Sequence, residues 1–191
     1  MDVKNNMPYS RPMLGFLLKK FFFDLWDNLF RMALINLGFI ASASIPIFIP
    51  PLLESVPFLS LAVLIAGILW CFVYITGAAI SLKAVADYGS FGFGDFFKNM
   101  KAAWPQGIAY CLLNFLLVLL AVKVIPFYIG LEAMPMLGLV LGAVIFWTLV
   151  ICTLSLQFFP AVLARRDTRI GGIIKKCFII FFDNSGFCIF S

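Results

Sequence analysis

The side chains with most chemical potential in this sequence are neutral polar residues that stand inside long apolar runs: Asn36, Thr76, Asn114, Thr148, Thr153 and Gln157. A polar group in such surroundings is costly unless it is paired, so each one is a candidate for a substrate pathway or for helix packing. We expect hydrogen bonds between helices to satisfy them. The alternative is that Asn36, Asn114 and Gln157 converge and line a small polar cavity.

Catalysis and metal binding have little support in the sequence. There is no His for general-base work, no Ser in a nucleophile-elbow context and no pair of carboxylates at helical spacing within an apolar run. The glycine-rich stretch 89–94 lacks the Lys-Ser/Thr ending of a phosphate-binding loop. The five cysteines have no close metal-ligand spacing: Cys71, Cys111, Cys152, Cys177 and Cys188. We therefore expect no enzyme, no cofactor and no metal site.

The composition excludes an ordinary soluble domain. Of the 191 residues, 63% are hydrophobic and only 12% are charged, whereas a soluble domain carries roughly a quarter charged residues. The net charge of +5 does not indicate a nucleic-acid binder, because the Lys and Arg residues lie at the ends of apolar runs rather than in a cluster. A lipid bilayer is the expected solvent.

Four apolar runs must position the polar side chains, and each is long enough to cross a hydrocarbon layer of about 30 Å. We predict one all-α, polytopic membrane domain over residues 1–191, with spans at 32–53, 58–82, 106–125 and 136–159. The prolines at 46, 50 and 51 should break the first helix near its end, and Pro126 and Pro160 should close the third and fourth spans. Gly138 and Gly142 would let helices approach closely, within this chain or at a dimer face.

Three amphipathic stretches punctuate these spans. Residues 11–30, 94–104 and 169–182 carry apolar residues at helical spacing opposite charged ones, which is typical of helices lying in the membrane interface. Their spacing of about seventy-five residues suggests a threefold repeat of interfacial helix plus hairpin, and the alternative is chance similarity. Residues 186–191 resemble the start of a fifth span, so we expect a truncated or frameshifted product.

The charges predict how the chain is oriented. This arrangement puts every Lys and Arg except Lys123 on one side of the membrane, which includes the amino terminus and should therefore be cytoplasmic. Basic residues expected to contact lipid headgroups or a partner on that side are Lys98, Lys101, Arg165, Arg166, Arg169, Lys175 and Lys176.

Several aromatic patterns resemble the YesL-type family of bacterial membrane proteins of unknown function, over most of the chain. They are the run Phe21-Phe22-Phe23-Asp24-Leu25-Trp26-Asp27, the run Asp95-Phe96-Phe97-Lys98-Asn99, and Phe159, Pro160, Leu163, Ala164, Arg165 and Asp167 before a basic helix. The resemblance implies a bacterial inner-membrane protein, further spans beyond residue 191 and an association with carbohydrate uptake. It implies no catalytic residue.

Two functions follow as expectations. The first is a non-enzymatic accessory or regulatory component, acting beside the permease subunits of a transporter. The alternative is a small-molecule transporter or substrate-capturing subunit of an uptake system, because the length and span number resemble those of vitamin-uptake subunits.

Overall fold

The computed structural model describes residues 29–87, 92–131, 134–165 and 169–184, together with Gly15, Leu18, Lys19, Phe22, Phe23 and Trp26. The elements in this part of the chain are all helices: α2 (Leu29–Leu52), α3 (Pro57–Ala86), α4 (Phe93–Ala102), α5 (Trp104–Ile129), α6 (Pro135–Leu156), α7 (Phe159–Leu163) and α8 (Ile170–Asp183). The predicted helices 11–30 and 186–191 fall mostly or wholly outside the described residues.

Four stretches are long and apolar enough to cross a membrane: α2, α3, α5, and α6 continued through α7. Within the described residues there is no strand. The prediction of an all-α, polytopic membrane protein is therefore confirmed.

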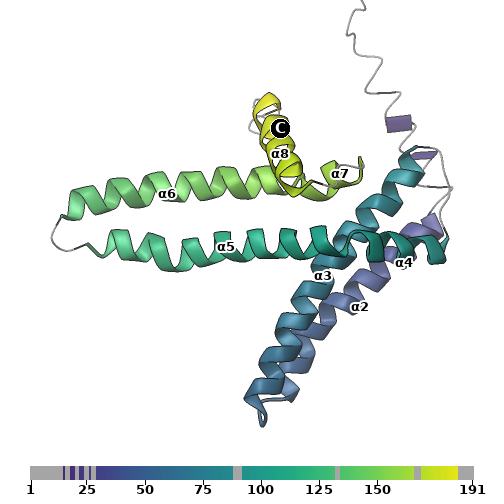
Figure 1. Ribbon diagram of the computed structural model, residues 1–191, viewed down its shortest axis with the longest axis horizontal. Coiled ribbons are helices and arrows are strands. Elements are labelled where there is room, and N and C mark those ends of the chain that lie inside the picture. Colours follow the sequence, from purple (N-terminus) through teal and green to yellow (C-terminus); the bar gives the residue numbers. More distant parts are fainter. Residues whose placement is uncertain are drawn as a thin grey trace, which may run out of the picture.

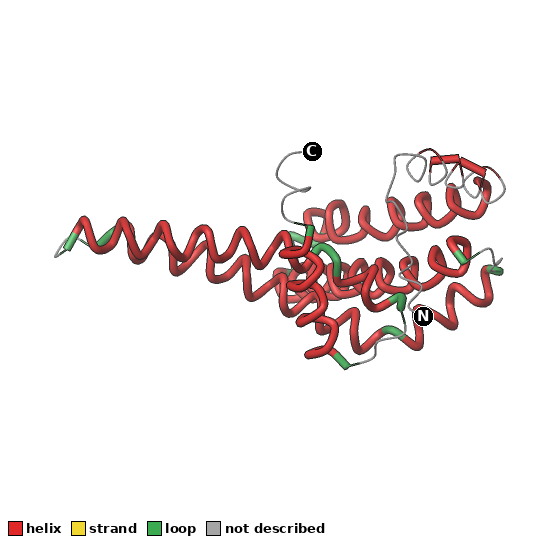
Figure 2. Tube along the Cα trace, turned by 90° about the horizontal axis from the view of Figure 1, so that it is seen from above, coloured by secondary structure: helices red, strands yellow, loops and turns green. Residues whose placement is uncertain are grey.

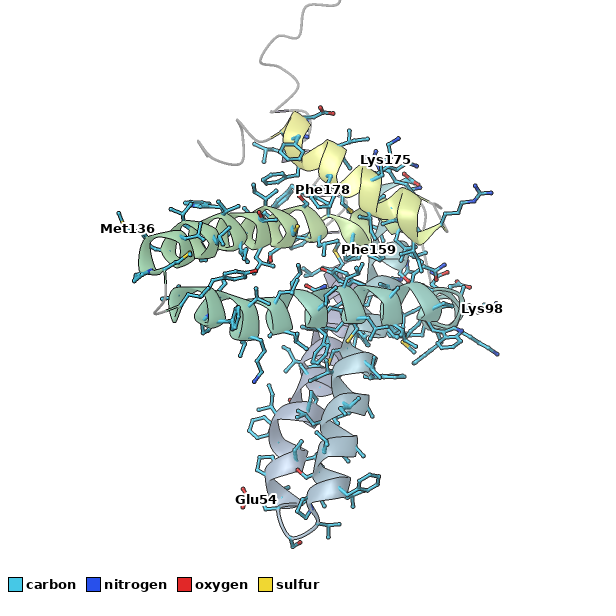
Figure 3. The ribbon with its side chains drawn as sticks, turned by 60° about the vertical axis from the view of Figure 1, so that its left-hand side comes forward. Glu54, Lys98, Met136, Phe159, Lys175 and Phe178 are labelled. Carbon is cyan, nitrogen blue, oxygen red and sulfur yellow. The ribbon has the colours of Figure 1, made fainter. Side chains whose placement is uncertain are left out.

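The four long helices form two hairpins that point in different directions. Figure 1 shows α2 and α3 side by side, and α5 and α6 side by side, with the hairpins meeting near α4 and α7. Seen from above in Figure 2, the α5–α6 hairpin extends well beyond the rest of the molecule. Glu54 and Met136, at the two hairpin tips, lie at separate extremities in Figure 3.

Polar bonds hold the first hairpin together along its length. The Tyr74 hydroxyl donates to the Ile35 carbonyl at 2.8 Å, and Trp70 Nε1 donates to Ser42 Oγ at 3.1 Å. Near the tip, Ser60 Oγ donates to the Pro50 carbonyl at 2.9 Å. In an apolar solvent such bonds between helices fix the register of the pair.

The prolines follow the prediction only in part. Helix α2 ends at Leu52, directly after Pro50 and Pro51, so the predicted break near the end of the first span is confirmed there, while the helix continues through Pro46. Pro126 lies inside α5, which continues to Ile129, so the predicted end at Pro126 is wrong. A β-carbon at Gly67 of α3 would lie 3.0 Å from the Pro46 ring, so the glycine gives that ring room. Membrane helices tolerate proline where a neighbouring helix accommodates it.

Pro160 also has a different role from the one predicted. The fourth span turns at Gln157 and Phe158, and Pro160 occupies the first turn of the short helix α7. Proline suits this position because an N–H there has no partner within the helix. The bend moves the chain after Leu156 toward α3 and α8.

Glycines bring backbones together in the second hairpin and at the junction. A β-carbon at Gly138 would overlap the Tyr128 carbonyl, and one at Gly142 would lie 3.2 Å from Ile129. The prediction that these two glycines pack closely within the chain is confirmed. At the junction, a β-carbon on Gly77 would lie 2.9 Å from the Met100 Cα, and one on Gly107 would lie 2.8 Å from the Val73 Cα.

The two described amphipathic helices pack on protein as well as facing outward. Helix α4 packs on α3 through Phe96 and Met100, while α8 packs on α6 and α7 with Ile173, Cys177 and Phe181 buried. Each therefore rests on the second helix of the hairpin that precedes it. The apolar core of α7 and α8 includes Phe159, whose ring stacks on Tyr110 at a centroid distance of 4.7 Å.

Candidate functional site

Most of the described cations gather where the two hairpins meet, a region we call the basic end. It comprises Arg31, Lys83, Lys98, Lys101, Arg165, Arg169, Lys175 and Lys176. Figure 3 shows Lys98 and Lys175 on this side, away from the hairpin tips marked by Glu54 and Met136. Lys123 is exposed farther along α5, beyond the junction.

A cleft of about 570 Å³, here called the outer cleft, opens at the basic end between α3 and the α6–α7 bend. Its polar side chains are Lys83, Asp87, Gln157 and Arg165, and alanines and Pro160 form much of the remaining wall. Lys83 Nζ lies 2.8 Å from Asp87 Oδ2. Arg165 forms no ion pair with any residue that the structure describes. The three charged groups therefore leave one net positive charge in the cleft.

A second cleft of about 260 Å³, the inner cleft, continues from the first between α2, α3 and α7. The two share Ala79, Leu82 and Pro160 in their walls, so they form one groove. The inner cleft is mostly apolar: Ile35, Asn36, Phe39, Tyr74, Ile75 and Ala78 complete its lining. The Tyr74 hydroxyl already donates to the Ile35 carbonyl, so its proton is committed within the protein.

The structure brings two of the three predicted cavity residues to this groove. Asn36 lines the inner cleft and Gln157 lines the outer one. Asn114 lines neither cleft, since no residue of α5 does, and its amide donates to the Tyr110 carbonyl one turn earlier in α5 at 2.8 Å.

The three threonines predicted inside the apolar runs also bond within their own helices. Thr76, Thr148 and Thr153 donate to the carbonyls of Val73, Val144 and Leu149, each at 2.8 Å. For these residues and Asn114 the expectation of bonds between helices is wrong. A hydroxyl or short amide in an apolar helix reaches the carbonyl three or four residues earlier without any partner helix.

The predicted headgroup or partner contacts lie on several elements. Lys98 and Lys101 are exposed on α4, where Lys98 lies 3.9 Å from Asp95, and Arg169, Lys175 and Lys176 are exposed at or on α8. Arg165 is exposed at the outer cleft, and Arg166 lies outside the described residues.

Sequence reasoning missed three residues of the groove: Lys83, Asp87 and Tyr74. Lys83 and Asp87 stand four residues apart at the end of an apolar run, which is a recognisable ion-pair spacing. Nothing in the sequence could place them opposite Arg165, because that depends on the bend after α6. Among the described residues, no three His, Cys, Asp or Glu side chains gather closely enough to hold a metal ion.

No protein-family model matches the chain, and comparisons with curated proteins and with solved structures find no match. Any function must therefore be argued from the chemistry and geometry of the residues themselves.

Proposed function

We propose that this protein is a non-enzymatic accessory or regulatory component of a membrane uptake system. One observation carries the proposal: in an 18-residue apolar window of each membrane-crossing segment, only 6–11% of the residues are buried inside the chain. Much of the span surface is therefore available for lateral contact with lipid or with another membrane protein. Helix association in membranes depends on such close lateral packing.

The resemblance to the YesL-type family supports carbohydrate uptake as the process and permease subunits as the partners. Its patterns include Phe96, Phe97, Lys98 and Asn99 on α4. Phe96 packs inward on α3, whereas Phe97 and Lys98 are exposed at the basic end. An exposed aromatic side chain at the headgroup level suits contact with a protein partner, because aromatic residues are enriched both at protein interfaces and at the membrane surface.

We place the protein in a bacterial inner membrane with its amino terminus and basic end in the cytoplasm. The positive-inside rule supports this orientation, since the described cations other than Lys19 and Lys123 lie at that end.

Co-purification tests the accessory function. Full-length tagged protein, expressed at its native level and extracted with surrounding lipid, should recover subunits of a carbohydrate permease. A variant carrying Lys98→Glu and Lys101→Glu should lose them, while Lys123→Glu, at the far side of the junction, should retain them. Recovery of no permease subunit by the wild-type chain would overturn the proposal.

The groove favours a second candidate, a substrate-capturing subunit. Asn36 and Gln157 give it neutral donors and acceptors, and its size falls within the range of small-molecule sites. A ligand that binds only the folded protein raises its Tm by mass action. A panel of sugars, vitamins and ions should then contain at least one compound that raises the Tm, and Asn36→Ala should reduce that rise.

A further inference from the structure

The groove combines a charged outer cleft with a mostly apolar inner cleft, which is the layout of a site for an amphiphile. Its outer cleft carries the charged residues, its inner cleft is lined mainly by apolar side chains, and the two share part of their walls. In the inner cleft the described polar side chains are Asn36 and Tyr74, and the hydroxyl proton of Tyr74 is already committed.

The position of the groove matches the depth of a lipid headgroup. Lys83 lies in the last turn of α3, and Arg165 lies two residues after the end of α7, so both mark the ends of membrane-crossing segments. Long cationic side chains at span ends extend toward the headgroups. Basic pockets between membrane helices are known types of site for anionic lipid headgroups.

The net positive charge of the outer cleft favours an anionic ligand. Lys83 is paired with Asp87 at 2.8 Å, whereas the Arg165 guanidinium has no ion pair with a described residue. A guanidinium presents a planar fork of donors that fits two oxygens of a phosphate. Gln157 lies in the same wall and can donate to a further oxygen.

We propose that this groove binds an anionic phospholipid, with the phosphate at Arg165 and Gln157 and an acyl chain in the inner cleft against Phe39 and Ile75. The inference goes beyond the proposed accessory function and does not depend on it, because the groove is formed within one chain.

Delipidated full-length protein in a mild detergent provides the test. Phosphatidylglycerol should raise its Tm, whereas phosphatidylcholine, which has the same chains and no net charge, should raise it much less. Arg165→Gln should weaken phosphatidylglycerol binding about tenfold or more, since it removes a charge-assisted contact. Lys123→Gln removes the same charge outside the groove and should leave the shift unchanged.

Two further arms separate the headgroup from the chain. Ala79→Leu adds bulk where the clefts join and should reduce the shift, and its own Tm without lipid shows whether it folds. Inorganic phosphate alone should produce no comparable shift, because it lacks the acyl chain. Equal shifts with the two lipids, an unchanged shift in Arg165→Gln, or a full shift with inorganic phosphate would each overturn the proposal.

Discussion

Cys177 is enclosed in the apolar core between α7 and α8, with none of its surface exposed. Burial removes water from around the thiolate and so raises the pKa of this thiol to about 11, above its ordinary value of 9.0. Because the thiolate is the reactive form, such a thiol should be inert near neutral pH.

In a variant whose only cysteine is Cys177, we expect N-ethylmaleimide to modify the folded protein very slowly at pH 7. A pKa of about 11 leaves roughly one thiolate in ten thousand at that pH. Intact-mass spectrometry over time gives the rate. Lys175→Cys, exposed on the same helix, should react rapidly, and Cys177 should match it once the protein is unfolded. Rapid labelling of folded Cys177 would contradict the burial.

For single residues, the sequence predicted which polar side chains inside apolar runs would need hydrogen-bond partners, but it did not predict which groups those partners are. Thr148 and Asn114 donate to carbonyls of their own helices, whereas Tyr74 and Trp70, which were not among the predicted polar candidates, make bonds between helices. The hydroxyl of Tyr74 donates to a backbone carbonyl. Because every residue has such a carbonyl, the sequence does not indicate which one accepts the bond.

Among the elements, the first hairpin depends on its internal hydrogen bonds. Tyr74→Phe removes the bond to the Ile35 carbonyl and should cost about 0.5–1.5 kcal/mol, the usual net contribution of an intramolecular hydrogen bond. Thermal unfolding in detergent measures the loss. Tyr128→Phe removes a hydroxyl with no hydrogen bond to any described residue, so its Tm should change little.

The junction between the hairpins depends on Gly77. Gly77→Ala places a methyl group 2.9 Å from the Met100 Cα, and overpacking of this kind costs about 1–3 kcal/mol. The Tm should fall accordingly. Gly171→Ala, in α8, has nothing within 4 Å of the added carbon and should keep or slightly raise the Tm, since Ala is the better helix former. Equal Tm values for the two variants would show that α3 and α4 are not in close contact.

Hydropathy located the long helices but not their ends or bends. The length of an apolar run identifies a segment that can cross the bilayer. Whether a proline interrupts that helix depends on the residues that pack beside it. Pro46 stays inside α2 because Gly67 of α3 leaves space for its ring, and Pro160 starts a helix because the chain has already turned at Gln157.

For the whole molecule, the arrangement predicts which sites share a side of the membrane. Single cysteines at Ser55 and Leu131, near the two hairpin tips, should react with an impermeant maleimide in intact cells. Cysteines at Lys98 and Lys175 should react only after the membrane is opened, because the basic end faces the cytoplasm in our proposal. Labelling of Ser55 and Leu131 from opposite sides would contradict the two-hairpin topology.

Charge and hydropathy predicted the two hairpins, but they carry no information about the direction of one hairpin relative to the other. That direction is set by contacts such as Gly107 against Val73, where the neighbours of a glycine decide how closely two helices cross. The groove depends on the same contacts, so the sequence could predict Asn36 and Gln157 as candidates without predicting the walls around them.

The crossing of α3 with α4 and α5 has a mechanical consequence. At Gly77 and Gly107 the backbones nearly touch, and the hairpins diverge on the side of their tips (Figure 1). Helices that cross a bilayer tilt by up to about 40° from its normal. A thinner or thicker bilayer would therefore change the tilt of each hairpin about this crossing. The same rotation would change the distance between Lys83 and Arg165, which lie on the other side of the crossing.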